Sequence, residues 1–264
     1  MITITNKKVA GFKPQWASYR GFSLLFDNPG ANVSPMSGPE EANLHTIDCS
    51  VGREKDLRLY RGFVKSLTKI GEQLLTNTYL FCPLPSYSYH VTVWDGLNDS
   101  RVRNVSAGYR LKLDDFLSNL PGSFLADEEF TRNVWRSPLV TKTDWSIKFK
   151  FEKLTKWGNR VLVARLMPAD QDSEEKFQRI IEHRTALSTK FEERFGITMQ
   201  NRFSPHVTLG YFANEQHAEL TSPRIDRWNE MIREKVEGQT VTFNSISLYG
   251  FTDMVTFFKR VLRD

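Results

Sequence analysis

Two short segments of this chain carry residues suited to acid–base chemistry. His90 is followed by Thr92, and His206 by Thr208, with a valine between them each time and apolar, β-favouring neighbours. Because side chains at i and i+2 of a strand point the same way, each segment presents an imidazole and a hydroxyl on one face. Two such strands brought together would form a pocket equipped to act on a phosphate ester.

Hydrolysis of a cyclic phosphodiester requires a base for the attacking water and an acid for the departing sugar oxygen. Histidine suits both tasks because its ordinary pKa is about 6.5, and positioned proton transfer contributes about 10²–10⁴ in rate. The hydroxyls of Thr92 and Thr208 would donate to the non-bridging oxygens, where charge accumulates. This chemistry requires no metal and no cofactor. The assignment of base and acid between His90 and His206 stays open.

Trp94 has the same strand parity as the first histidine, so it either stacks on a base or sugar of the substrate or packs in the core. Tyr211 has the opposite parity from the second histidine and is predicted to lie in the core. The remaining histidines lie beside a polar loop or among polar residues and receive no catalytic role: His45, His183 and His217.

The order strand, helix, histidine strand occurs twice along the chain. In the first copy, apolar residues at helical spacing predict a helix over 57–74, followed by a short strand at 78–81 and the first motif. In the second, alternation predicts a strand over 145–152, an apolar run predicts a central strand over 161–167, and a helix begins near Asp172 and ends near Gly196.

The rest of the chain surrounds these two copies. A segment rich in Gly, Pro, Asn and Ser at 27–43 predicts a long loop, and 96–140 predicts an insertion with helices at 114–120 and 127–135. A polar helix is predicted over 226–236. The chain then ends in strands 241–251 and 255–261, joined as a hairpin.

The composition excludes several classes of protein. With 264 residues, 40% of them hydrophobic, the chain can bury a full core. Its net charge of +5 is compatible with an anionic substrate but is too small for a protein that coats nucleic acid. No apolar run approaches the roughly 18 residues of a membrane span, and residues 1–12 lack the apolar stretch expected of a secretory signal. Cys49 and Cys82 form neither a disulfide framework nor a zinc spacing, so a cytoplasmic location is expected.

At its two motifs the sequence resembles the two-histidine (2H) phosphoesterase superfamily, in which two His-x-Ser/Thr-apolar segments mark two lobes. Residues 203–210, which contain His206 and Thr208, resemble the second motif of that superfamily almost residue for residue. The form of the first motif and the long chain resemble a branch with bacterial and fungal members. The resemblance implies an α+β, bilobal duplicated fold, in which two antiparallel sheets face each other across a central cleft with helices outside. It implies one domain over 1–264, with lobes at about 17–94 and 144–264 that can exchange strands, and an insertion at about 96–140.

The resemblance also implies the activity: metal-independent hydrolysis of 2′,3′-cyclic phosphodiesters, or hydrolysis or ligation at 2′–5′ linkages, in a nucleotide or RNA. His90 and His206 would be the proton-transfer pair, and Thr92 and Thr208 the phosphate ligands, with no obligatory protein partner. Two alternatives stay open: a nucleotide- or RNA-binding module without turnover, and a metallo-hydrolase, which lacks a clustered third ligand. A phosphate-binding Gly-rich loop and a serine-hydrolase elbow are both missing from the sequence.

Overall fold

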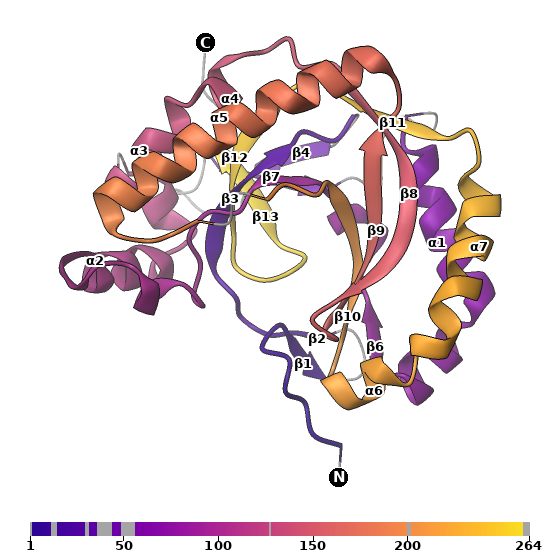
Figure 1. Ribbon diagram of the computed structural model, residues 1–264. Coiled ribbons are helices and arrows are strands. Elements are labelled where there is room, and N and C mark those ends of the chain that lie inside the picture. The colour runs from indigo at the N-terminus through magenta and orange to yellow at the C-terminus, as the bar shows by residue number, and fades with distance from the viewer. Residues whose placement is uncertain are drawn as a thin grey trace.

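The computed structural model describes residues 2–11, 15–29, 32–35, 44–48, 56–126, 128–199 and 202–260, which form helices around two antiparallel sheets (Figure 1). The five-stranded sheet has the order β11-β8-β9-β10-β6. Its strands are β6 (Phe81–Pro83), β8 (Ile147–Trp157), β9 (Val161–Pro168), β10 (His206–Phe212) and β11 (Thr240–Phe243). The apolar strand predicted over 161–167 therefore lies at the centre of its sheet, as predicted.

The six-stranded sheet has the order β4-β5-β13-β12-β3-β7. Its strands are β3 (Gly21–Phe26), β4 (Asn32–Pro35), β5 (Leu44–Asp48), β7 (Thr92–Trp94), β12 (Ile246–Phe251) and β13 (Phe257–Arg260), and a separate ribbon pairs β1 (Val9–Gly11) with β2 (Gln15–Trp16). All these pairings are antiparallel. The mixed helix-and-sheet class with antiparallel sheets is confirmed.

Each sheet contains strands from both halves of the chain. Strand β6 precedes the first motif but pairs with β10, which carries the second. The C-terminal β12 pairs with β3 on one side and with β13 on the other. Between the sheets, the ring of Phe26 on β3 stacks on Phe243 at 4.8 Å and meets Phe149 edge-on at 5.6 Å. Burying aromatic side chains of this size contributes about 1.5–3 kcal/mol each, so this cluster stabilises the contact between the sheets.

Helices cover the outside of the sheets (Figure 1). Helices α1 (Arg58–Ile70) and α7 (Ile225–Val236) pack together against the five-stranded sheet, and the long α5 (Gln171–Phe195) contacts β7, β8 and β9. The shorter helices are α2 (Ala107–Ser118), α3 (Glu129–Trp135), α4 (Pro138–Thr141) and α6 (Glu215–Glu219). Single turns of 3₁₀ helix lie at Ser86–Ser88, Val102–Asn104, Gly122–Leu125 and Ser222–Arg224, and one of π helix at Leu74–Thr78. None of the described helices is long and apolar enough to span a bilayer.

The ends of α5 follow from its capping residues. Asp170 precedes the helix, and its side chain accepts a hydrogen bond from the Ser173 backbone N–H at 2.9 Å, two residues before the predicted cap at Asp172. Gly196 ends the helix with φ +67°, a left-handed conformation that glycine adopts without steric cost.

Two sequence predictions about loops and strands were wrong. The segment 241–251 is two strands in different sheets, because the chain leaves β11 at Phe243 and re-enters as β12, where Ser245 and Ser247 donate hydrogen bonds to the Asp27 carboxylate. The segment 27–43 is not loop throughout, because β4 lies within it and pairs with β5, which begins directly after it. Residues 30, 31 and 36–43 lie outside the described residues.

Candidate active site

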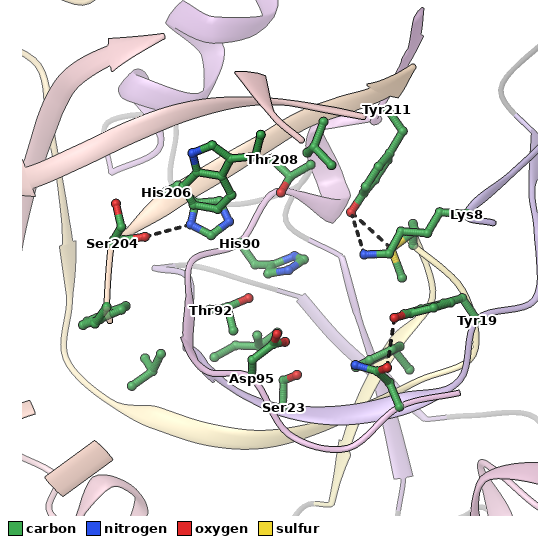
Figure 2. Close-up of a pocket in the computed structure, with 18 of the residues that line it drawn as sticks. Lys8, Tyr19, Ser23, His90, Thr92, Asp95, Ser204, His206, Thr208 and Tyr211 are labelled. Atoms are coloured by element: carbon green, nitrogen blue, oxygen red, sulfur yellow. Dashed lines mark hydrogen bonds between the residues drawn. The ribbon is translucent and has the colours of Figure 1, made fainter. Parts of the chain in front are cut away.

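The two histidine motifs lie side by side. An isolated antiparallel bridge pairs Val91 with Val207, the central residues of the two motifs. Continuing this pairing by one residue in each direction sets His90 against Thr208, and Thr92 against His206. All four residues line one pocket of about 700 Å³ (Figure 2). The tertiary structure thus brings together the four predicted residues from distant parts of the chain.

Both imidazoles are oriented by the same backbone contact. The Nδ1 atom of His90 lies 2.8 Å from the carbonyl oxygen of Ser88, and that of His206 lies 2.9 Å from the carbonyl oxygen of Ser204. A carbonyl can only accept a hydrogen bond, so each Nδ1 carries the proton in the neutral ring. Each Nε2 therefore keeps its lone pair and is available as a base.

An aromatic ring flanks each imidazole. The ring of Phe257 lies 4.5 Å from that of His90, and the ring of Trp157 lies 4.2 Å from that of His206, measured between centroids. Burial lowers the pKa of both histidines to about 4; the carbonyl contacts and Asp95 act in the opposite direction. The positive charge of Lys8 lowers both pKa values further. Both imidazoles are therefore neutral at pH 7 in the protein alone.

A β-bulge follows the threonine in each motif. In the first, Thr92 pairs with Leu25 and Trp94 with Leu24, so Val93 is an additional residue with no partner on β3. In the second, Thr208 pairs with Val163 and Gly210 with Leu162, so Leu209 is the additional residue on β10. A bulge inverts the facing of every residue after it.

These bulges change the facing that strand parity assigns to two residues, and they place Trp94 in the core, one of its two predicted positions. Trp94 does not line the pocket: it is 1% exposed, packs on Phe191 at 4.7 Å and donates its indole N–H to the Ser188 hydroxyl at 3.2 Å. Tyr211 is buried as predicted, but it lines the pocket. Asp95 also lines the pocket. It stands five residues after His90, just as Tyr211 stands five residues after His206.

The sequence held one signal for the second bulge and none for the first. A glycine inside a strand, here Gly210, indicates a bulge or a close backbone approach. A side chain there would place its Cβ 2.4 Å from the Cys82 carbonyl oxygen. No comparable residue follows Thr92.

The pocket wall favours an anion. Among the described residues, one carboxylate lines it, that of Asp95, which pairs with Arg101 at 3.1 Å. The basic side chains that line it are more numerous, and sequence reasoning selected none of them: Lys8, Lys156, Arg165, Arg184 and Arg202.

The other predicted features lie elsewhere. His183 is on α5 with its Nε2 3.2 Å from the Lys142 amine, and His217 is in α6; neither lines the pocket. His45 is in β5. Burial raises the pKa of Cys82 to about 11, and Cys49 is outside the described residues. Within the described ranges, no three His, Cys, Asp or Glu side chains cluster closely enough to hold a metal ion.

Comparison with known proteins identifies a fold and no family. No family model and no curated protein matches the chain. Among solved structures, it is similar to a conserved protein of unknown function from Agrobacterium tumefaciens, with a TM-score of 0.52 and 13% identity over 97% of this chain and 90% of that one. At that identity the likeness concerns the fold alone.

Proposed function

We propose that this protein is a metal-independent phosphodiesterase that hydrolyses a cyclic phosphodiester, the 2′,3′-cyclic phosphate of a nucleotide or an RNA end. The observation that carries the proposal is the Val91–Val207 bridge, which sets each histidine beside the threonine of the other motif. Two oriented imidazoles and two threonine side chains then line the same basic pocket. The same four groups also suit a 2′–5′ phosphodiester.

We further propose that the two sheets form two equivalent lobes facing each other across this pocket. Three features recur in both motifs and support the equivalence. Each histidine contacts the carbonyl oxygen two residues earlier, each has an aromatic ring beside it, and each motif has a bulge at the residue after the threonine.

In the proposed reaction, the Nε2 of one imidazole takes a proton from water as the water oxygen attacks phosphorus. The Nε2 of the other gives its proton to the sugar oxygen as the phosphorus–oxygen bond breaks, leaving a phosphomonoester. One imidazole must therefore be protonated, although burial holds both pKa values near 4. The negative charge of a bound phosphodiester favours the imidazolium, so the substrate itself promotes the active protonation state.

The threonines and the pocket wall would stabilise the transition state. The hydroxyls of Thr92 and Thr208 can donate to the non-bridging oxygens, whose negative charge grows as water attacks. Basic side chains around the pocket add attraction for the phosphate. A preorganised donor of this kind contributes about 10²–10³ in rate.

The test is turnover in excess chelator of 2′,3′-cyclic mononucleotides, oligonucleotides with a cyclic end and 2′–5′ linked oligomers. We expect hydrolysis by the wild type, and a loss of about 10² or more with His90→Asn and with His206→Asn. His183→Asn, which changes a histidine outside the pocket, is the matched control. Tight product binding with no turnover of any substrate would favour a binding module, and activity restored by a metal ion would favour a metallo-hydrolase; either result rejects the proposal.

A further inference from the structure

The N-terminal segment is fastened to the strand that carries the second motif. The backbone N–H groups of Thr5 and Asn6 donate to the Ala213 carbonyl oxygen at 2.9 and 3.0 Å. Asn6 is buried, and its amide donates to the carbonyl oxygens of Phe212 at 2.9 Å and Arg160 at 3.2 Å. Its Oδ1 accepts the Lys8 backbone N–H at 3.2 Å. The backbone before Lys8 is therefore held at a defined place beside the pocket.

The Lys8 side chain enters the pocket between two tyrosines (Figure 2). Its ammonium lies 4.8 Å from the ring centroid of Tyr19, 5.0 Å from that of Tyr211, and 3.5 Å from the Tyr211 hydroxyl oxygen. Such contacts stabilise a cation without neutralising it. Burial acts to lower the pKa of Lys8, but Tyr211, Tyr19 and Asp95 together raise it above its ordinary value, so Lys8 stays charged at neutral pH.

Two other basic side chains of the pocket wall already have polar partners in the protein, although the Nε of Arg165 has none. Lys156 donates to the Ala218 carbonyl and the Ser222 hydroxyl at 2.8 and 2.7 Å, and Arg165 pairs with the Glu152 carboxylate at 3.1 Å. Among the described residues, by contrast, no carboxylate lies within ion-pair distance of the Lys8 ammonium. A half-buried charge without a counter-ion is costly, and a bound anion would remove that cost.

We propose that Lys8 is a substrate-binding residue, whose ammonium is the counter-ion of the phosphate group that lies between the two histidine motifs. The inference rests on the proposed function, which places a phosphodiester in this pocket. A phosphodiester carries one negative charge and gains more in the transition state. The threonine hydroxyls carry no charge, and both imidazoles are neutral at pH 7 until the substrate binds, so Lys8 supplies positive charge that is already present in the free protein. The Lys8 charge lowers the pKa of both histidines, as expected of a group near the reacting phosphate.

The first test is anion binding by calorimetry, with adenosine 3′-monophosphate and inorganic phosphate as probes. Lys8→Met removes the charge and keeps the apolar stem, whereas Lys8→Arg keeps the charge. We expect Lys8→Met to weaken binding about ten- to a hundredfold and Lys8→Arg to restore most of it. Lys7→Met is the matched control, because it removes the same charge from an exposed neighbour; we expect a change of less than about twofold.

The second test follows the titration of the two histidines and depends on neither turnover nor anion binding. Removing the Lys8 charge should raise the pKa of both His90 and His206, followed by the NMR signals of their imidazoles, while Lys7→Met should leave both titrations in place. A purely structural role of Lys8 would change thermal stability without moving the two titrations together. If Lys8→Met does not fold, Lys8→Gln takes its place in both tests.

The two proposals fail in different ways. A wild-type protein that binds phosphate but hydrolyses none of the phosphodiesters would reject the phosphodiesterase, and the binding comparison would still decide the role of Lys8. Anion binding that is equal in wild type and Lys8→Met, with unmoved histidine titrations, would overturn the role of Lys8 even if the enzyme is active. Failure of the wild type to bind either probe would overturn it as well.

Discussion

Acidification should destabilise this protein through the two histidines of the pocket. Their pKa values are near 4 in the folded state, because burial disfavours the imidazolium, and near 6.5 in the unfolded chain. Between these values the unfolded state binds more protons than the folded state. The free energy of unfolding therefore rises with pH in this window, and it falls as the solution is acidified.

The size of the effect follows from the same two values. For one group with pKa 4 folded and 6.5 unfolded, the free energy of unfolding falls by about 2 kcal/mol between pH 7 and pH 5, so His90 and His206 together contribute about 4 kcal/mol. Asp27 and Asp170 have lowered pKa values, so their contribution is lost only below the ordinary aspartate range. The lowered pKa of His183 adds in the same direction.

The assay is urea unfolding at pH 7, 6 and 5 for the wild type, His90→Asn, His206→Asn and the double variant. Asparagine can still donate to the carbonyl oxygen that each Nδ1 contacts, but it does not titrate. Each single variant should remove about half of the pH dependence that the two pocket histidines give to the free energy of unfolding. The double variant should retain only the part due to His183. The variant His183→Asn, as the control, should keep most of the wild-type slope.

A wild-type stability that is flat between pH 7 and pH 5, or a double variant with an unchanged slope, would show that the pKa values of the two histidines are not lowered in the folded protein. The histidines would then be hydrated or already charged in the free protein. A bound phosphodiester would then not be needed to protonate one imidazole.

Three further predictions concern single side chains. Thr92→Val and Thr208→Val keep the shape but remove a donor, so each should lower kcat by about 10²–10³ in the phosphodiester assay with little change in thermal stability. Gly210→Ala should lower the free energy of unfolding, measured in urea, by about 1–3 kcal/mol, because its Cβ would lie 2.4 Å from a carbonyl oxygen of β6. Gly108→Ala, in an open position on α2, should raise it by up to about 1 kcal/mol. Trp94→Phe should lose about 1 kcal/mol of stability with its indole hydrogen bond but keep kcat/KM within about twofold; a large loss of activity would return Trp94 to the pocket.

The sequence by itself determined the two motifs and the elements around them. A histidine and a threonine two residues apart on a strand share a face through local geometry alone, and both pairs do line the pocket. Helix α5 and the central strand β9 also follow from periodicity within a short window. These features depend on neighbours in the chain, which is why the sequence predicts them.

The tertiary structure decided everything that depends on a partner strand. A bulge exists only relative to the strand it pairs with, so the facing of Trp94 cannot be read from the sequence beyond Thr92, and Gly210 is the one local sign that the facing changes before Tyr211. The split of 241–251 between two sheets has the same origin. Lys8 reaches the pocket because Asn6 is hydrogen-bonded to β10. The residues around Lys8 in the sequence give no sign of this contact. The sequence supplied the histidines and threonines, and long-range pairing brought the two motifs together and set the facing of the residues after them.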